Sequence, residues 1–528
     1  MHLFLQKVLV LHKRYQTFVR YFLPAVAAFL LVTPAFAQKK TRIHIIHADH
    51  YRYNARFSKD IQQLIGHVKL KQDSTLFLCD SAFLNDKTKS LDAFGQVHID
   101  VNDTLSLYGN RLHYDGKQRI GELFGNVRLE DPKAVLTTEH LVFNRITGIA
   151  YYDGGGTIVS DSNVLKSRRG DYDTKAKIFY FKKDVVLTNP DQVTYADTLI
   201  YNTITKTAYF RGPTVIKGNK SIIKCVDGWY NTDNGEVQMR KRPEISGGEQ
   251  QLTADSIHYN NHIGFGRAFG HIRVLDTLHN LLVKGHVAEI WNNKGVTFVT
   301  DSAVGITYDQ QDSMFLHADT LWIYFDRQHQ AKKMLAYHSV RFYRLDLQGK
   351  CDSLAYAMSD STIRLYHAPV LWTGKNQLTS DSIFIAVHNN QLDSLTLFNT
   401  AFIISLDSID NYNQIKGRNM VGYFRNNQIY RVKVDGNAQS IYWVRDDQKR
   451  LIGINKAEAS YMTIGVKNNE IKTINYIEKA SETMYPEKDL PKDGRILKGF
   501  SWQATSRPLS KYDIFRKTKK KKISSRLE

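Results

Sequence analysis

The chain has 528 residues, a formal net charge of +20 and only three cysteines. This length exceeds one ordinary globular core, so the chain either divides into domains or forms a repeat array whose core grows in one dimension. The positive charge indicates a partner that carries phosphates. Because Cys79, Cys225 and Cys351 lie far apart without metal-ligand spacing, a disulfide framework and a zinc site are excluded, and we expect each thiol to be buried as a small hydrophobe.

Residues 1–37 are predicted to be an export signal. Basic residues precede an apolar run from Tyr21 to Val32, and a small-residue exit, Ala35-Phe36-Ala37, provides an A-x-A cleavage site. The run is shorter than the roughly 20 residues that a membrane-spanning helix needs. The next residue is Gln38, so a lipoprotein anchor is not expected. We expect the mature chain in the periplasm, with at most a peripheral association with the outer membrane, which argues against nucleic acid as a partner.

One sequence unit then recurs with a period of about 30 residues, typical of a solenoid or array. It consists of an apolar residue, a small residue, an acid or Asn, and two alternating apolar or aromatic positions, as in Ala196-Asp197-Thr198-Leu199-Ile200-Tyr201. The other clear copies contain Asp49, Asp80, Asn110, Glu139, Asp255, Asp319, Asp352 and Asp381. Because Tyr, Phe, Val, Ile and Thr alternate with polar residues, the units predict an all-β chain of short strands that stack edge to edge.

A glycine accompanies this unit at a fixed distance. Fifteen residues after Asp80, Asn110, Glu139, Asp197 and Asp255 stand Gly95, Gly125, Gly154, Gly212 and Gly270. Several of these glycines open an alternating stretch, such as Gly125-Asn126-Val127-Arg128-Leu129, which predicts a half-buried strand.

The phase of the alternation changes at the acidic position. Around Asp255 the apolar residues stand at odd offsets before the acid and at even offsets after it, which requires a bulge or a corner. Asp and the following Ser or Thr can bond nearby backbone N–H groups, so we interpret these positions as corners, with calcium binding or catalysis as the alternative. The predicted structural corners are Asp80, Asp197, Asp255, Gly95, Gly125 and Gly270.

The regularity of the repeat divides the chain after the export signal into three parts. Clear copies cover residues 38–410, and weaker copies without the glycines cover residues 411–480. From Ser481 prolines appear, followed by a basic cluster at Lys517 to Lys522, so residues 481–528 are predicted to be a basic, flexible tail. This tail is either solvated or in contact with anionic lipid heads.

The repeats resemble the OstA/LptA-type lipopolysaccharide-transport family. The resemblance lies in G-x-V-x-L strands, such as Gly66 to Leu70, that alternate with A-D-x-L-x-Y units, and the D-S and D-T corners are similar to those of the long OstA-like proteins of Bacteroidetes-type bacteria. It implies a repetitive, open β-jellyroll with an apolar interior that shields the acyl chains of lipopolysaccharide or lipid A. It also implies pairing with other transport components, and self-association, through exposed end strands, without a cofactor.

If the resemblance extends to function, the inward aliphatic and aromatic residues bind the lipid. The residues predicted for this role are Val68, Leu70, Leu76, Leu78, Val97, Ile99, Leu112, Val127, Leu129, Leu141, Phe143, Leu199, Ile257, Ile272 and Val274. The alternative for each of them is ordinary core packing, because lining a cleft and filling a core require the same residue types.

Two other classes of function compete with a lipid conduit. A β-helix enzyme acting on polysaccharide would cluster its acids on adjacent turns, whereas here the acids recur once per repeat, and no common catalytic motif is present, so we expect no enzymatic activity. A surface adhesin or envelope scaffold would use the same repeats with a closed, packed interior. Scattered histidines share no metal-ligand spacing, and we interpret them as surface or satisfied residues; they are His258, His271, His286 and His317.

Overall fold

The computed structural model describes residues 42–53, 60–219, 221–308, 313–328, 330–388, 391–446, 448–467 and 470–516. The predicted export signal and the cluster at Lys517 to Lys522 lie outside these residues. The described elements are strands apart from four short 3₁₀ turns, which confirms the all-β prediction. Within the described part of the chain, no helix is long and apolar enough to cross a membrane.

The chain separates into two compact units, Met1–Leu129 with Val142–Thr147 and Glu130–Leu141 with Gly148–Glu528. In the first unit β3, β4 and β5 each pair antiparallel with the strand that follows, and β1 and β2 both pair with β3. Its strands are β1 (His44–His47), β2 (His50–Tyr53), β3 (Ile61–Gln72), β4 (Thr75–Asn85), β5 (Ser90–Val101) and β6 (Leu105–Asp115), and it shares β7 (Ile120–Asp131) and β8 (Ala134–Asn144) with the second unit.

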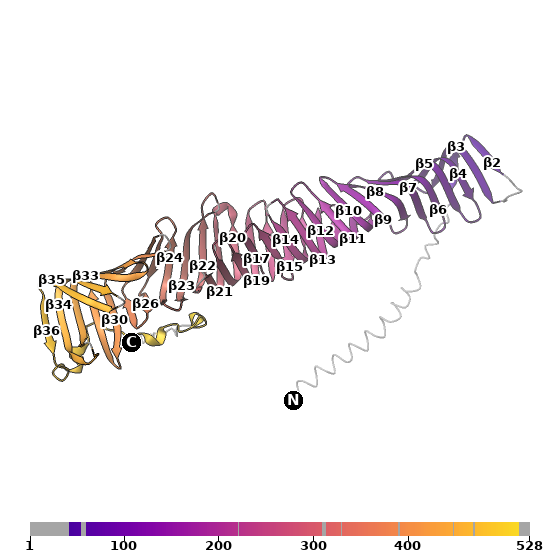
Figure 1. The fold of residues 1–528 in the computed structure, drawn as a ribbon. Helices are drawn as coiled ribbons and strands as arrows, with labels where there is room; N and C mark the ends of the chain where they lie inside the picture. The colour runs from indigo at the N-terminus through magenta and orange to yellow at the C-terminus, as the bar shows by residue number, and fades with distance from the viewer. Residues whose placement is uncertain are drawn as a thin grey trace, which may run out of the picture. The chain divides into compact units, whose positions relative to one another are not determined.

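The second unit continues this antiparallel order, and Figure 1 shows its strands following one another along the chain. It contains β9 (Ile149–Ser160), β10 (Asn163–Asp173), β11 (Ile178–Thr188), β12 (Gln192–Asn202), β13 (Thr207–Gly218), β14 (Ile222–Asn231), β15 (Glu236–Arg240), β16 (Glu244–Gly247), β17 (Gln250–Thr253), β18 (Ser256–Asn260), β19 (Phe265–Asp276), β20 (Leu281–Trp291), β21 (Val296–Tyr308), β22 (Ser313–Phe325), β23 (Ala331–Tyr343) and β24 (Gln348–Ala357).

It then continues with β25 (Thr362–Tyr366), β26 (Val370–Thr373), β27 (Asn376–Thr379), β28 (Ser382–His388), β29 (Gln391–Phe398), β30 (Ala401–Ser408), β31 (Asn411–Gly417), β32 (Asn419–Arg425), β33 (Gln428–Arg445), β34 (Leu451–Lys467), β35 (Glu470–Ile477) and β36 (Ser481–Tyr485). Its 3₁₀ turns are η1 (Asn292–Lys294), η2 (Lys492–Arg495), η3 (Ala504–Ser506) and η4 (Asp513–Phe515). Several strands are broken at their middle, so that β24 pairs with β25 over one half and with β26 over the other.

The two repeated sequence markers meet at a bend in the middle of the strands. The register between β4 and β5 shifts between Leu78 and Ser81, and opposite this shift Gly95 and Gln96 have φ angles of 74° and 43°. A Cβ atom at Gly95 would lie 2.2 Å from Oδ2 of Asp80. The acid and the glycine therefore lie against each other across two neighbouring strands, and the glycine is required both by its backbone angle and by the close carboxylate.

These bends fold the sheet back on itself. The Tyr114 hydroxyl donates a hydrogen bond of 2.6 Å to Oε1 of Gln72, although Gln72 ends β3 and Tyr114 lies near the opposite edge of the strand array, at the end of β6. Strands of this length would hold the two edges of a flat sheet about 35 Å apart. Each strand must therefore bend at its middle, so that its two halves lie in two facing layers. The change of phase at the bend keeps the apolar side chains of both halves of the strand between these layers.

Replacing Gly95 with alanine should destabilise the first unit by about 1–3 kcal/mol, because the residue must keep a positive φ and its methyl group must displace the Asp80 carboxylate. Gly248 provides a control, since it also has a positive φ, of 56°, but its Cβ would meet nothing within 4 Å. Urea unfolding of the two alanine variants compares them. If Gly95→Ala lowers the free energy of unfolding no more than Gly248→Ala does, the close Asp80 carboxylate has no role in requiring glycine.

The structure corrects the prediction that the chain is flexible from Ser481 onward. Residues 481–485 form β36, which pairs with β34, and residues 486–516, here called the C-terminal segment, pack on the second unit. Leu490, Leu497 and Ile514 of this segment are no more than 6% exposed. Pro486 and Pro491 of this segment are exposed, whereas Pro508 is buried.

The three cysteines are unpaired and buried. Burial raises the pKa of the Cys79 and Cys351 thiols to about 12 and that of the Cys225 thiol to about 11. Because the thiolate is the reactive species, these thiols are poor nucleophiles at neutral pH.

Candidate functional site

The candidate site is the apolar interior between the two layers of bent strands. Most residues predicted to bind lipid point into it and are no more than 5% exposed, namely Val68, Leu70, Val97, Ile99, Leu112, Val127, Leu129, Leu141, Phe143, Leu199, Ile257 and Ile272. Val274 is half-buried and packs against the core cluster of the second unit. The strands place these side chains in the interior because alternate residues of a strand face the same side.

Two of the predicted residues face the other way. Leu76 and Leu78 lie half-buried on the outer face of β4, and the inward positions belong to Phe77 and Cys79, which are 1% and 6% exposed. The expectation that Leu76 and Leu78 line the interior is therefore corrected. The sequence already indicated this, because the inward apolar residues before Asp255 stand one and three positions ahead of the acid. The same positions before Asp80 are Cys79 and Phe77.

The bends carry exposed histidine–aspartate pairs that sequence reasoning missed. Nδ1 of His271 lies 2.7 Å from Oδ2 of Asp255, and the Asp255 backbone N–H donates to the Gly270 carbonyl at 2.9 Å. His67 contacts Asp49 at the same distance of 2.7 Å, and this hydrogen bond lowers the pKa of Asp49 and raises the pKa of His67. The signal was the histidine that directly follows the bend glycine in these two repeats.

A second feature that sequence reasoning missed is a line of polar contacts between the two edges of the folded sheet, here called the seam. In the first unit Arg145 donates from Nη1 to Oε1 of Gln72 at 3.1 Å and to the Tyr114 hydroxyl at 2.9 Å. Arg119 forms an ion pair of 3.1 Å with Asp73. Burial raises the pKa of Tyr114, so its hydroxyl stays protonated and can donate.

The seam of the second unit is built in the same way. Lys177 pairs with Asp131, whose side chain is fully buried, and Lys206 lies 3.3 Å from Asp161. In each case the acid lies at one edge of the folded sheet and the base at the other. The spacing is a sequence signal for the seam, since the base follows the acid by 46 residues in the pairs of Asp73 and Asp131 and by 45 in the pair of Asp161.

The interior changes in character along the chain. In β3 to β7 most of its fully buried residues are aliphatic, for example Leu64, Leu91, Leu107 and Leu123. In β9 to β13 large aromatic side chains fill it, namely Tyr152, Tyr172, Phe179, Phe181, Tyr201 and Phe210. The rings of Tyr172 and Phe179 stack with centroids 3.8 Å apart, so this stretch is packed as a core.

The structure shows no cluster of at least three His, Cys, Asp or Glu side chains suited to a metal ion, as far as its described residues extend. The acids at the bends are separated from one another by whole repeats, and Asp49 and Asp255 each contact the histidine of their own bend. The arrangement supplies apolar surface and paired charges, which suits binding.

Comparison with known proteins gives a family match over part of the chain. The model of a family described as OstA-like protein matches residues 40–197, which confirms the resemblance of the repeats to the OstA/LptA type over this stretch. Among solved structures, the chain is similar to LptH of Pseudomonas aeruginosa, described as the LptA homologous periplasmic component of the conserved lipopolysaccharide transport device. That chain is 11% identical, with a TM-score of 0.20, and the match covers 22% of this chain and 81% of LptH. No curated protein matches the chain.

Proposed function

From the premise that residues 40–197 are an OstA-like segment of the lipopolysaccharide-transport type, we propose that this protein is a periplasmic conduit. It binds the acyl chains of lipopolysaccharide or lipid A in its interior and passes the lipid toward the outer membrane. The predicted export signal supports the location. The basic charge of the chain supports a phosphorylated lipid as the cargo.

The observation that carries the proposal is the combination of an aliphatic interior with a polar seam. The backbone hydrogen bonds run from strand to strand along the array, so parting the two edges breaks none of them. Over the described residues the seam is closed by side-chain contacts, and its exposed ion pairs, such as Lys206 with Asp161, contribute about 0–1 kcal/mol each. Burial of each acyl CH₂ group contributes about 0.8 kcal/mol, so an acyl chain can offset the loss of several seam contacts.

The proposal places lipid entry at the seam. Side chains fill the interior, since Leu70, Leu112 and Leu129 have no exposed surface. The acyl chains therefore enter by separating the two edges and replacing contacts between the layers. The bends stay in place because they lie in the middle of the strands, away from the seam.

We further propose that other transport components join the chain by strand addition at its ends. β1 and β2 at one end are exposed, and Ile46, Tyr51 and Tyr53 are between 51% and 55% exposed. At the other end β36 is exposed, with Met484 at 49%. Exposed end strands with apolar side chains are suited to pairing with a strand of another molecule, including a second copy.

A scaffold that holds no lipid is the second candidate, and the aromatic filling of β9 to β13 favours it for that stretch. A photo-crosslinking residue placed in living cells separates the two functions. At the inward positions Leu129 and Ile272 we expect adducts with lipopolysaccharide, and at Arg273, the exposed neighbour of Ile272, we expect none. Equal adduct levels at Ile272 and Arg273, or none at either inward position, would exclude the conduit.

A further inference from the structure

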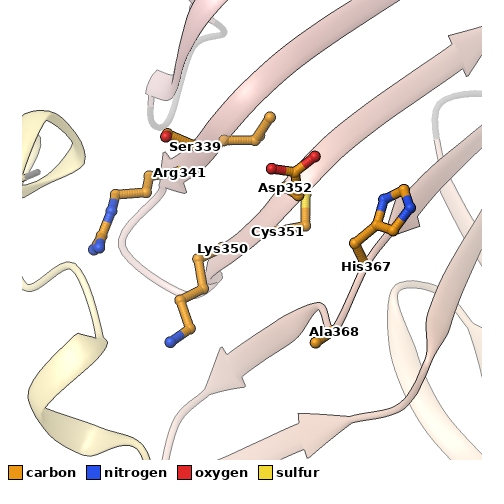
Figure 2. Close-up of a pocket in the computed structure, with 8 residues that line it drawn as sticks. Ser339, Arg341, Lys350, Cys351, Asp352, His367 and Ala368 are labelled. Atoms are coloured by element: carbon orange, nitrogen blue, oxygen red, sulfur yellow. The ribbon is translucent and has the colours of Figure 1, made fainter. Parts of the chain in front are cut away.

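A cavity of about 230 Å³ lies on the second unit where β23 bends and where the chain passes from β25 to β26. It is lined by Ser339, Val340, Arg341, Lys350, Cys351, Asp352, His367 and Ala368. Figure 2 shows the side chains of Arg341 and Lys350 extending to the same side, toward the C-terminal segment. The cavity is a separate feature from the interior, because Val340 and Phe342 point into the core cluster and Arg341, which alternates with them, points to the outer face.

Basic residues lie directly opposite one another at this cavity. Arg341 of β23 is the cross-strand partner of Lys350 of β24, and on its other side Arg341 is the partner of His317 of β22. Like charges directly opposite each other destabilise an antiparallel pair. The placement of Arg341 against Lys350 therefore costs the fold stability unless an anion neutralises it.

Burial makes this arrangement more costly. Arg341 is 6% exposed, and Lys350 is half-buried, with its ammonium 6.0 Å from the ring centre of Trp372. Burial lowers the pKa of Lys350, and the neighbouring Arg341 lowers it further. The C-terminal segment provides much of the cover, since Nη1 of Arg341 donates to the Ser506 carbonyl at 3.3 Å.

The nearby acids are committed to other groups. Asp352, which lines the cavity, lies 3.1 Å from Nδ1 of His338. Asp513 of the C-terminal segment pairs with Arg516 at 2.7 Å and also accepts hydrogen bonds from the Leu509 and Ser510 N–H groups. Burial lowers the pKa of Arg341, and the charges of Asp513 and Arg516 act on it in opposite directions, since Arg516 lowers this pKa and Asp513 raises it. Within the described ranges, no carboxylate forms an ion pair with Arg341 or Lys350.

The remaining titratable groups facing the cavity do not compensate the two cations. Nδ1 of His367 lies 3.3 Å from the Ser353 hydroxyl, and Nδ1 of His317 faces the Ala303 carbonyl at 2.9 Å. Burial lowers the pKa of His317, which keeps this imidazole neutral beside Arg341. Arg341 and Lys350 therefore present two positive charges to the cavity.

We propose that this cavity is a binding site for a phosphate group. Arg341 would clamp two phosphate oxygens with its planar guanidinium, Lys350 would supply a second positive charge, and the Ser339 hydroxyl at the bend would donate a further hydrogen bond. Two positive charges match a phosphate monoester, which carries roughly −1.5 to −2 near neutral pH. The volume is below the roughly 300 Å³ at which drug-sized pockets begin, so the site fits a phosphate headgroup and excludes an acyl chain.

The proposal is tested first with inorganic phosphate and the full mature chain, by calorimetric titration at constant ionic strength. We expect saturable binding that Lys350→Gln or Arg341→Gln weakens at least tenfold. The matched control is the double variant Arg273→Gln/Lys284→Gln, since these two basic residues also lie opposite each other on neighbouring strands but are exposed. We expect this control to change the affinity less than twofold. Equal phosphate binding in the wild type and in Lys350→Gln overturns the proposal.

Thermal unfolding gives an independent readout that a folding defect would not imitate. Without phosphate, Lys350→Gln should unfold at a higher temperature than the wild type, because it removes one of two opposed buried charges. Added phosphate should raise the unfolding temperature of the wild type and leave that of Lys350→Gln unchanged. A phosphate-induced shift that is the same in both proteins contradicts the proposal.

Vesicles distinguish the source of the phosphate. Phosphatidylcholine vesicles that contain phosphatidic acid present the group on a lipid, whereas glycerol 3-phosphate presents it in solution. Binding of the wild type to the vesicles that depends on Lys350 assigns the site to a lipid headgroup. Binding of glycerol 3-phosphate without vesicle binding assigns it to a soluble phosphate ester, and binding of neither overturns the proposal. Because the site is on the outer face, all of these outcomes are independent of lipid binding in the interior.

Discussion

Replacing Leu497 with alanine is expected to detach the C-terminal segment from the second unit, at a cost of about 2–5 kcal/mol. Leu497 is 6% exposed and packs in a cluster on the outer face of the sheet with Phe402, Ile404 and Trp443. Hydrogen exchange of residues 490–515 measures the loss, because a repeat array can open locally without global unfolding. Leu509→Ala in the same segment should change exchange little, since Leu509 is 70% exposed.

Two buried glutamines explain why the segment follows one path over the sheet. Gln377 donates to the Ser501 carbonyl at 2.7 Å and accepts from the Gln503 N–H at 2.7 Å, and it is fully buried. Gln414 contacts the segment in the same way, donating to the Arg495 carbonyl and accepting from the Leu497 N–H, each at 2.8 Å. Each amide satisfies two backbone groups two residues apart. Unchanged protection of the segment in Leu497→Ala would show that Leu497 is not needed to hold it.

Replacing Lys177 with methionine is expected to destabilise the second unit by about 3–5 kcal/mol, because it leaves the buried Asp131 carboxylate without its ion-pair partner. The Lys133 N–H, which donates to Oδ1 of Asp131 at 3.1 Å, compensates only part of this charge. Urea unfolding and hydrogen exchange at the start of β11 measure the effect. The double variant Lys177→Met/Asp131→Asn should recover much of the loss, since no charge is then buried.

An exposed pair of the same unit is the matched control. Lys224 lies 3.5 Å from Glu244, but the two side chains are 60% and 32% exposed. Lys224→Met should therefore cost at most about 1 kcal/mol. Equal losses from Lys177→Met and Lys224→Met would mean that the seam contributes no more to stability than a surface ion pair, which would also weaken its role in closing the interior.

The proposed conduit and the proposed phosphate site make different use of the same sheet. The conduit needs an interior that opens at the seam, whereas the phosphate site needs the outer face and the covering C-terminal segment. Leu497→Ala should therefore weaken phosphate binding at Arg341 and Lys350 while leaving lipid adducts at Leu129 intact. This difference allows the two proposals to fail separately.

The sequence by itself determined the all-β class, the period of the repeat, the glycine at a fixed distance from the acid and the change of phase at the acidic position. These are local properties, because the alternation of side chains fixes the faces of a strand and a positive φ next to a carboxylate tolerates only glycine. The same local rule, applied to Asp80, would have placed Phe77 inward and Leu78 outward.

Only the tertiary structure decided how the interior is closed and where the chain ends. The seam joins residues such as Asp131 and Lys177, which become neighbours only when the strands bend and bring opposite edges of the sheet together. The C-terminal segment is held by widely spaced residues such as Leu497, whose burial depends on the apolar outer face formed by distant strands. The opposition of Arg341 and Lys350 likewise depends on strand register, which a single local pattern does not specify.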